Sequence, residues 1–155
     1  MLTISDGVAA GTREDESGDI LADLLAGEGF EVERQLVPDE RPAIAAALKK
    51  LALEAQLIVT TGGTGVAPRD FTPEATESVL DRRVPGIEQA IRADAIAKMP
   101  HGLLSRAVAG VRDRTLIVNL PGSPGGCRDG FAVIRPALEH AISLLSDEKT
   151  EHRQT

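Results

Sequence analysis

The sequence predicts an α/β domain, a three-layer sandwich in which a mostly parallel central sheet carries helices on both faces. Two observations lead to this fold. Short apolar runs of strand length alternate along the chain with amphipathic stretches long enough for helices, which is typical of parallel sheets. The run Leu57 to Thr60 also lacks the alternation of a half-exposed strand, which favours a central strand covered on both faces.

In the first half of the chain, the apolar pattern predicts three strands and two helices. Ser17 is expected to cap the first helix, and Gly27 and Gly29 to end it. The second strand is expected to stop at Pro38-Asp39. In chain order, the expected elements are the strand Leu2 to Ile4, the helix Ser17 to Ala26, the strand Phe30 to Val37, the helix Arg41 to Glu54 and the strand Leu57 to Thr60.

In the second half, Thr72 has the residue type of a helix cap, with Pro73 at the first helical position and Glu74 complementing the helix dipole. The expected elements are a helix from Thr72, a helix Ile87 to Lys98 after a break at Pro85-Gly86, strands Ala107 to Val111 and Thr115 to Leu120 around a polar turn, and a helix Arg128 to Leu145. We expect one domain over residues 1–146 and a frayed polar tail over residues 147–155.

Composition narrows the classes of partner. A net charge of −7 and only 2% aromatic residues disfavour nucleic-acid binding, which needs clustered cations or stacking surfaces. The single Cys127 cannot form a disulfide within the chain, so the cytoplasm is the expected location. Neither a signal peptide nor a membrane span is predicted. An acidic protein can still bind small anions through backbone N–H groups, a few cations or a divalent metal ion.

Four loops that follow the predicted strands contain the residues of chemical interest. Ligands of open parallel sheets bind at the carboxyl ends of the strands. We therefore expect these loops to converge on one site. They are Ser5-Asp6, residues 38–40, residues 61–65 and residues 121–126.

The turn Thr61-Gly62-Gly63-Thr64-Gly65 has the composition of a phosphate-binding loop. Glycines let the backbone approach an anion closely and present several N–H groups, and Thr61 and Thr64 add hydroxyls. Neither the P-loop pattern nor the dinucleotide-binding pattern is present. From the glycines alone, a tight connection between a strand and a helix explains the turn equally well.

Asp39 and Asp70 are two carboxylates expected at this same edge, with Asp6 as a third candidate. Carboxylates beside phosphates typically hold Mg²⁺, which bridges to phosphate oxygens. Each aspartate alone is more simply explained as a turn or cap residue. Two of them beside a glycine loop favour a metal site.

The loop Pro121 to Gly126 is a second glycine-rich segment, with Pro121, Gly122 and Ser123 as its candidate ligand contacts. It suits a second phosphate or a flat heterocycle. A plain connection between a strand and a helix is equally compatible with its composition.

Four other residues have side chains that commonly serve in active sites. Arg69 and Arg106 are candidates for bidentate contact with phosphate, although most single arginines are simply solvated. His101 has no Asp, Cys or second His at ligand spacing. For Cys127 a buried thiol is expected rather than a nucleophile.

Together these motifs resemble those of the molybdopterin adenylyltransferase family, the MogA/MoaB group of molybdenum cofactor biosynthesis. They are spread over nearly the whole chain in the family's order. The main match is the turn at residues 60–65 followed by Arg69-Asp70-x-Thr72-Pro73-Glu74-Ala75-Thr76. Further matches are Ser5-Asp6, Asp15-x-Ser17-Gly18, Pro38-Asp39, Pro85-Gly86, Leu104-Ser105-Arg106 and residues 119–124.

The resemblance implies transfer of AMP from ATP to the terminal phosphate of molybdopterin, with Mg²⁺ and release of pyrophosphate. It implies that Asp39 and Asp70 are the functional, metal-binding aspartates, because they match the family's two aspartates. It also implies a homotrimer or a pair of trimers. Action alone and action beside a molybdenum-insertion protein as partner are both compatible with it. The chain departs from the family in two places. Gly125-Gly126-Cys127 replaces a run that often begins with Lys, and apolar residues usual before Ser5-Asp6 are missing.

Two other interpretations stay open at this point. A non-catalytic molybdopterin-binding protein of the same family would carry the same loops, since loops alone do not separate binding from turnover. A general nucleotide-binding domain explains the glycines but not Arg69-Asp70 or the Pro121 to Pro124 motif. The nucleotide preference is not indicated by any residue.

Overall fold

The computed structural model describes residues 1–146 and contains a six-stranded sheet with helices on both sides. The tail expected over residues 147–155 lies outside the described residues, so the proposed domain boundary at residue 146 stays a prediction. In chain order the elements are β1 (Leu2–Ile4), α1 (Asp6–Ala9), α2 (Glu16–Gly27), β2 (Gln35–Val37), α3 (Arg41–Leu51), β3 (Leu57–Thr61), α4 (Thr72–Val79), β4 (Arg82–Arg83), α5 (Pro85–Lys98), the 3₁₀ helix η1 (Pro100–Leu104), β5 (Ala109–Arg112), β6 (Thr115–Leu120) and α6 (Pro124–Leu145).

The strand order in the sheet is β2-β1-β3-β6-β5-β4. The first four of these strands run parallel, with Leu57 to Thr61 of β3 paired residue by residue with Leu116 to Leu120 of β6. Only β5 runs the other way, antiparallel to both β6 and β4. The mostly parallel sheet expected from the sequence is therefore confirmed, with an antiparallel strand near one edge.

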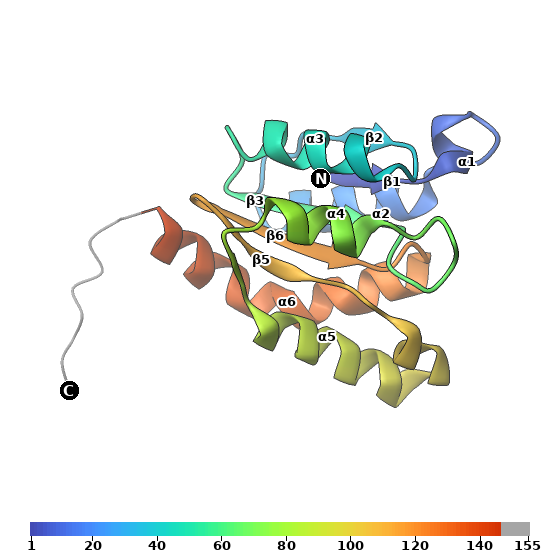
Figure 1. Ribbon diagram of the computed structural model, residues 1–155. Helices are drawn as coiled ribbons and strands as arrows, with labels where there is room; N and C mark the ends of the chain where they lie inside the picture. The colour runs from blue at the N-terminus through green and yellow to red at the C-terminus, as the bar shows by residue number, and fades with distance from the viewer. Residues whose placement is uncertain (147–155) are drawn as a thin grey trace.

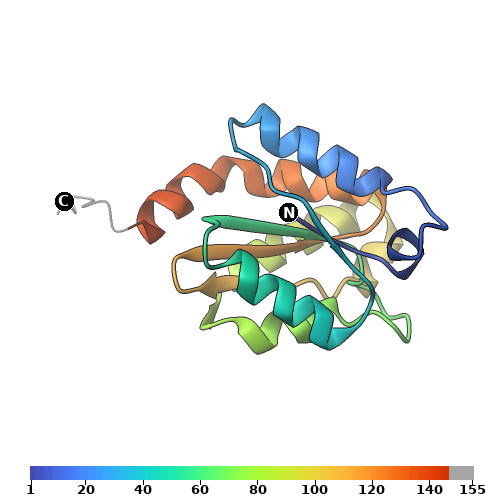
Figure 2. The same cartoon turned by 90° about the horizontal axis from the view of Figure 1, so that it is seen from above.

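Two apolar layers separate the sheet from its helices. One layer packs α2, α5 and α6 against one face and contains Leu21, Phe131 and Val59. The other packs α3 and α4 against the opposite face and contains Ile44, Val79 and Ile58. Successive residues of a strand point to opposite faces, so Ile58 and Val59 enter different layers. Figure 2 shows α2 and α6 on one side of the sheet and α3 on the other. The three-layer arrangement is thus confirmed.

The second strand is shorter than expected, because only Gln35–Val37 is paired. The neighbouring strand β1 begins at Leu2 and, on this side, pairs only with these three residues. Residues 30–34 therefore have no strand beside them among the described residues. Residues 30–33, together with residues 54–58, line a groove of about 750 Å³ at the opposite end of the sheet from the loops discussed below.

Several other bounds differ from the sequence-based expectation. The helix α3 ends at Leu51 rather than Glu54, β5 begins at Ala109 rather than Ala107, and α5 begins at Pro85, within the expected break.

The remaining differences are at helix starts. Asp15, rather than Ser17, caps α2, accepting a hydrogen bond from the N–H of Gly18 at 3.0 Å. Thr72 is not a cap, since its hydroxyl donates to the carbonyl of Gly62 at 2.8 Å. Ser123 caps α6, which therefore begins four residues before the expected Arg128. The short elements α1, β4 and η1 were not expected from the apolar pattern.

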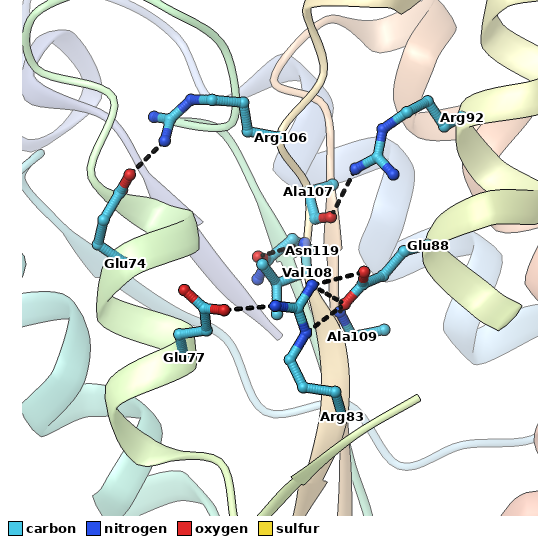
Figure 3. A network of polar contacts seen from close by, with 10 residues as sticks. All are labelled: Glu74, Glu77, Arg83, Glu88, Arg92, Arg106, Ala107, Val108, Ala109 and Asn119. Carbon is cyan, nitrogen blue, oxygen red and sulfur yellow. Dashed lines mark hydrogen bonds and ion pairs between the residues drawn. The ribbon is translucent and has the colours of Figure 1, made fainter. Parts of the chain in front are cut away.

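A buried side-chain amide links β6 to β3, to α4 and to the segment before β5. Asn119 on β6 is fully buried, and its Nδ2 donates to the hydroxyls of Thr60 and Thr76 at 3.0 Å each. Its Oδ1 accepts from the N–H of Val108 at 3.1 Å, a contact drawn in Figure 3. Every polar group of the amide that faces the interior is thus satisfied, which fixes α4 relative to β3 and β6.

Candidate functional site

A cleft of about 760 Å³ lies at the carboxyl edge of the parallel strands. The α1 segment, the loop after β3 and the start of α6 surround this end of the sheet, on the right of Figures 1 and 2. Each of the four predicted loops contributes to the lining, as expected from the parallel topology. The predicted site residues in the lining are Ser5, Asp39, Thr61, Gly62, Gly63, Asp70, Gly122 and Ser123.

The other predicted site residues lie next to the lining. Asp6 is hydrogen-bonded to Asp39. The carbonyl of Pro121 accepts a hydrogen bond from the hydroxyl of Thr61 at 2.8 Å. Two more support the Asp70 loop, since Thr64 is buried and Gly65 lies against the Asp70 carboxylate.

Asp39 is held at the end of β2 by a reciprocal contact with Asp6. The N–H of Asp6 donates to Asp39 Oδ2 at 2.8 Å, and the N–H of Asp39 donates to Asp6 Oδ1 at 2.9 Å. Asp39 Oδ1 takes no hydrogen bond from the described residues and lies beside Gly63. One oxygen of the carboxylate therefore fixes its position and leaves the other available to a ligand.

Burial raises the pKa of Asp39, and the negative charges of Asp6 and Asp70 raise it further. These contributions outweigh the opposing effect of the hydrogen bond from the backbone of Asp6 and of the Arg69 charge. A carboxylate whose ionised form is disfavoured by other carboxylates gains from a nearby cation.

Asp70 closes a tight loop between β3 and α4. Its N–H donates to the carbonyl of Ala67 at 3.0 Å, and its Oδ2 accepts from the N–H of Ala67 at 2.9 Å. A Cβ on Gly65 would lie 2.9 Å from this oxygen, so only glycine leaves room for it. Asp70 Oδ1 takes no hydrogen bond from the described residues. The two aspartates thus each offer one unengaged oxygen near the same cleft.

The glycine turn after β3 has a backbone that side chains would not permit. Gly62 has φ +104°, and a Cβ there would lie 2.2 Å from the carbonyl oxygen of Ile4. Gly63 has φ +69°, and its Cβ would meet the Thr72 hydroxyl at 2.3 Å and Asp39 Oδ1 at 3.2 Å. The first close approach lets β1 and β3 end side by side. The second lets the Thr72 hydroxyl and Asp39 Oδ1 lie against Gly63, whose carbonyl accepts a hydrogen bond from the N–H of Thr72 at 3.1 Å.

The loop after β6 combines a helix start with the cleft wall. Ser123 Oγ accepts from the N–H of Gly126 at 3.1 Å, which makes Ser123 the cap of α6. The beginning of a helix carries partial positive charge and suits an anion. The expected hydroxyl contact is thus already engaged as an acceptor, although the Ser123 O–H still has a proton to donate.

Asp6 and Arg69 form an ion pair across the loops. Arg69 Nε and Nη2 bond the two carboxylate oxygens of Asp6 at 2.6 and 3.1 Å, and this contact holds the pKa of Asp6 below its ordinary value. Arg69 is therefore engaged by protein rather than free for phosphate. Asp6, considered as a third metal ligand, has both oxygens engaged.

The loop between α1 and α2 forms a wall of the cleft that was not predicted. It brings Arg13, Glu14, Asp15 and Glu16 into the lining. Asp15 is fixed by the hydroxyl of Thr3, which donates to its Oδ2 at 2.8 Å. The Asp15-x-Ser17-Gly18 match was the available signal for this wall, because it also follows the first strand.

Charge in the cleft is mainly negative. Among the described residues that line it, Arg13 is the only cation, against the carboxylates of Glu14, Asp15, Glu16, Asp39 and Asp70. No cluster of three or more His, Cys, Asp or Glu side chains in residues 1–146 is arranged to hold a metal ion. Mg²⁺ commonly binds through one or two carboxylates and completes its shell with water and phosphate oxygens. The free oxygens of Asp39 and Asp70 fit that kind of site.

Cys127 in the first turn of α6 is fully buried, with its Sγ 3.8 Å from the carbonyl oxygen of Ser17, a residue that lines the cleft. Burial raises the pKa of its thiol to about 11. The expectation of a buried thiol is confirmed. Within the described part of the chain, no helix is both long and apolar enough to cross a membrane.

The fold and the cleft define a class of protein: an α/β domain that can hold a phosphate-bearing ligand at the carboxyl edge of a parallel sheet, beside two available carboxylates. Comparison with known proteins is consistent with that class. The family model described as a probable molybdopterin binding domain matches residues 1–140. The chain belongs to this family, and within it to the MogA/MoaB group.

Relatives and solved structures agree on this assignment. The crystal structure of the molybdopterin biosynthesis enzyme MoaB from Thermus thermophilus is 49% identical, with a TM-score of 0.87 and coverage of 94% of this chain and 93% of that one. A molybdopterin adenylyltransferase from Helicobacter pylori is 39% identical over 94% of this chain and 85% of its own length. Gephyrin from Dictyostelium discoideum is 41% identical over 96% of this chain, which spans only 22% of that longer protein.

Proposed function

We propose that this protein is a molybdopterin adenylyltransferase that transfers AMP from ATP to the terminal phosphate of molybdopterin. The observation that carries the proposal is the pair of aspartates, Asp39 and Asp70, each fixed through one carboxylate oxygen and open to the cleft through the other. Relatives named as molybdopterin adenylyltransferases support the substrates. Molybdopterin and ATP are both substrates in this proposal, and Mg²⁺ is the cofactor.

The transfer itself needs positioning rather than a protein nucleophile. An oxygen of the pterin phosphate attacks the α-phosphorus of ATP, a new P–O bond forms, and the bond to the β-phosphate bridging oxygen breaks. Pyrophosphate leaves and adenylylated molybdopterin remains. Because both reactants are polyanions, alignment and neutralisation of charge dominate the barrier.

Different residues of the cleft would bind the metal ion, bind the phosphates and support the loops. Asp39 and Asp70 would hold Mg²⁺, which supplies charge neutralisation at the phosphates. The backbone N–H of Gly62 is donated to the carbonyl of Leu120 at 3.3 Å, so the glycine turn would receive a phosphate through the N–H of Gly63. Ser123 with the start of α6 would receive the second phosphate. Ser5, Thr61, Pro121 and Gly122 shape the walls between them, while Asp6, Thr64 and Gly65 hold the aspartates in place.

The runner-up function is a molybdopterin-binding protein without turnover. Incubation of the purified protein with molybdopterin, ATP and Mg²⁺, followed by measurement of pyrophosphate and adenylylated pterin, separates the two. The enzyme forms both products in equal amounts. Tight binding of the pterin with neither product would establish the runner-up and reject the adenylyltransferase.

The proposal extends to assembly and location. The family resemblance supports a homotrimer, or a pair of trimers, and a molybdenum-insertion protein as partner. Exposed apolar side chains on and after α5, at Ile96, Met99, Leu103 and Leu104, are compatible with a contact between protein chains. Light scattering of the purified protein tests the trimer, and cell fractionation tests the cytoplasmic location.

A further inference from the structure

We propose that Arg106 is a positioning residue that holds the Gly65 to Asp70 loop in the shape that presents Asp70 to the cleft. Arg106 does not line the cleft, and its polar contacts are with protein groups. The inference rests on the proposed function in one respect, namely that Asp70 binds the metal ion.

Arg106 contacts both ends of the loop at once. Its Nε donates to the carbonyl of Gly65 at 2.7 Å, and its Nη2 donates to the carbonyl of Asp70 at 2.7 Å. Its own backbone N–H donates to the carbonyl of Thr64 at 2.9 Å. A rigid guanidinium plane that bonds two carbonyls fixes the distance between them, which a flexible ammonium does not.

These contacts matter for the shape of the loop, because few hydrogen bonds within the loop stabilise it. Its residues belong to no helix or strand, and Val66 at its tip is 63% exposed. Within the loop, the hydrogen bonds that the structure shows are the two that join Asp70 to Ala67. At its outer side Arg69 pairs with Asp6, but both side chains are about half exposed and screened by solvent, whereas the Arg106 contacts are partly buried.

Arg106 is itself anchored to two structural elements. Its Nη1 pairs with Glu74 in the first turn of α4, as Figure 3 shows. The chain on both sides of it is fixed by Arg92 of α5, which donates to the carbonyls of Ser105 at 2.9 Å and Ala107 at 3.0 Å. Through Arg106, the Asp70 loop is therefore held at a fixed position relative to α4 and to the segment before β5.

This geometry assigns Arg106 a different role from the phosphate contact considered from the sequence. The edges of its guanidinium that carry Nε and Nη2 are directed at loop carbonyls, and Nη1 is neutralised by Glu74. A phosphate would have to displace these partners. The structure thus favours a residue that acts through Asp70.

Arg83 on β4 provides a matched control for the test. Its guanidinium also bonds two partners, Glu88 and Glu77, but its hydrogen bonds reach neither the Asp70 loop nor the segment around Arg106. The variants to compare are Arg106→Lys and Arg83→Lys, which keep the charge and lose the planar guanidinium. Three readouts are measured: tryptic cleavage after Arg69, Mn²⁺ binding in the presence of ATP by electron paramagnetic resonance, and turnover.

We expect Arg106→Lys to raise the rate of tryptic cleavage after Arg69 about tenfold and to weaken Mn²⁺ binding about tenfold or more. kcat falls in parallel while the KM for molybdopterin stays within about twofold of wild type. Arg83→Lys leaves cleavage and Mn²⁺ binding unchanged, whatever its melting temperature.

Unchanged cleavage and Mn²⁺ binding in Arg106→Lys would overturn the proposal, as would equal changes in both variants, because these indicate general loosening. If Arg106→Lys does not fold, Glu74→Gln replaces it, and Mn²⁺ binding should weaken several-fold while unchanged binding rejects the role. If wild type makes no adenylylated pterin but the cleavage and Mn²⁺ results hold, the proposed function fails and the positioning role stands.

Discussion

Asp6 and Asp39 hold each other through two reciprocal hydrogen bonds, in which the backbone N–H of each donates to the carboxylate of the other at 2.8 and 2.9 Å. They are 33 positions apart in the chain and follow adjacent parallel strands. The contact joins the ends of β1 and β2 and leaves Asp39 Oδ1 facing Gly63. It explains how a loop aspartate can be fixed well enough to hold a cation.

Replacing Asp39 separates its stability effect from its function. A raised pKa means that Asp39 contributes stability below its unfolded pKa, which is lost as pH rises through the higher folded pKa. Asp39→Asn keeps an oxygen for the N–H of Asp6 and has no charge to bury. We expect the melting temperature of Asp39→Asn to exceed that of wild type at pH 7, with the difference shrinking towards pH 3.

The same variant should lose at least about 100-fold in turnover, because the proposed metal ligand is removed. Thermal unfolding from pH 3 to pH 7 and an activity assay check both parts. A variant less stable than wild type at neutral pH would contradict the charge argument.

Asp70→Asn tests the second aspartate. Asparagine can still accept from the N–H of Ala67, so the loop should keep its shape while the negative charge is lost. We expect turnover to fall at least about 100-fold and pterin affinity to change less than about twofold. Unaltered turnover removes Asp70 from the metal role.

The glycine turn is tested by a pair of alanine substitutions. Gly62→Ala places a Cβ 2.2 Å from a backbone oxygen at a positive φ, and should cost about 3 kcal/mol of stability. Gly125→Ala, in the first turn of α6, meets nothing within 4 Å and should be neutral or stabilise by up to about 1 kcal/mol. Urea unfolding of both variants gives the comparison, and equal effects would mean that the turn geometry is not a constraint.

Cys127 should be unreactive in the folded protein. With a pKa of about 11, only about 0.1% of the thiol is ionised at pH 8, and the side chain is fully buried. Labelling with iodoacetamide at pH 8 should therefore be at least about 100-fold slower in buffer than in denaturant. Fast labelling of the native protein would show that the packing around Cys127, in the first turn of α6, opens to solvent.

Much of the fold could be predicted because the apolar residues of this sequence recur at helical spacing and because Gly and Pro residues mark the ends of several elements. The periodic helices and the apolar run at β3 were found within a few residues, and parallel topology then brought Asp39, Asp70 and the two glycine loops to one edge. The convergence of the site followed from strand direction alone, without knowledge of any side-chain contact.

The remaining features depend on contacts that short-range patterns do not contain. Asp15 and Ser17 are both good cap residues, and the contact with Thr3 and Gly18 decides for Asp15. The start of α6 contains Pro124-Gly125-Gly126, a poor helix-forming run that tertiary packing overrides. The pairing of Arg69 with Asp6 spans 63 positions and has no local signature.

The fate of the α-phosphate of ATP tests the proposed AMP transfer itself. Wild-type protein is incubated with molybdopterin, Mg²⁺ and ATP that carries a radiolabel either at the α- or at the γ-phosphate. We expect the α-label to move to the pterin and the γ-label to pyrophosphate, with one α-label transferred per pyrophosphate released. Transfer of the γ-label to the pterin, or no transfer of either label by folded protein that binds the pterin, would contradict it.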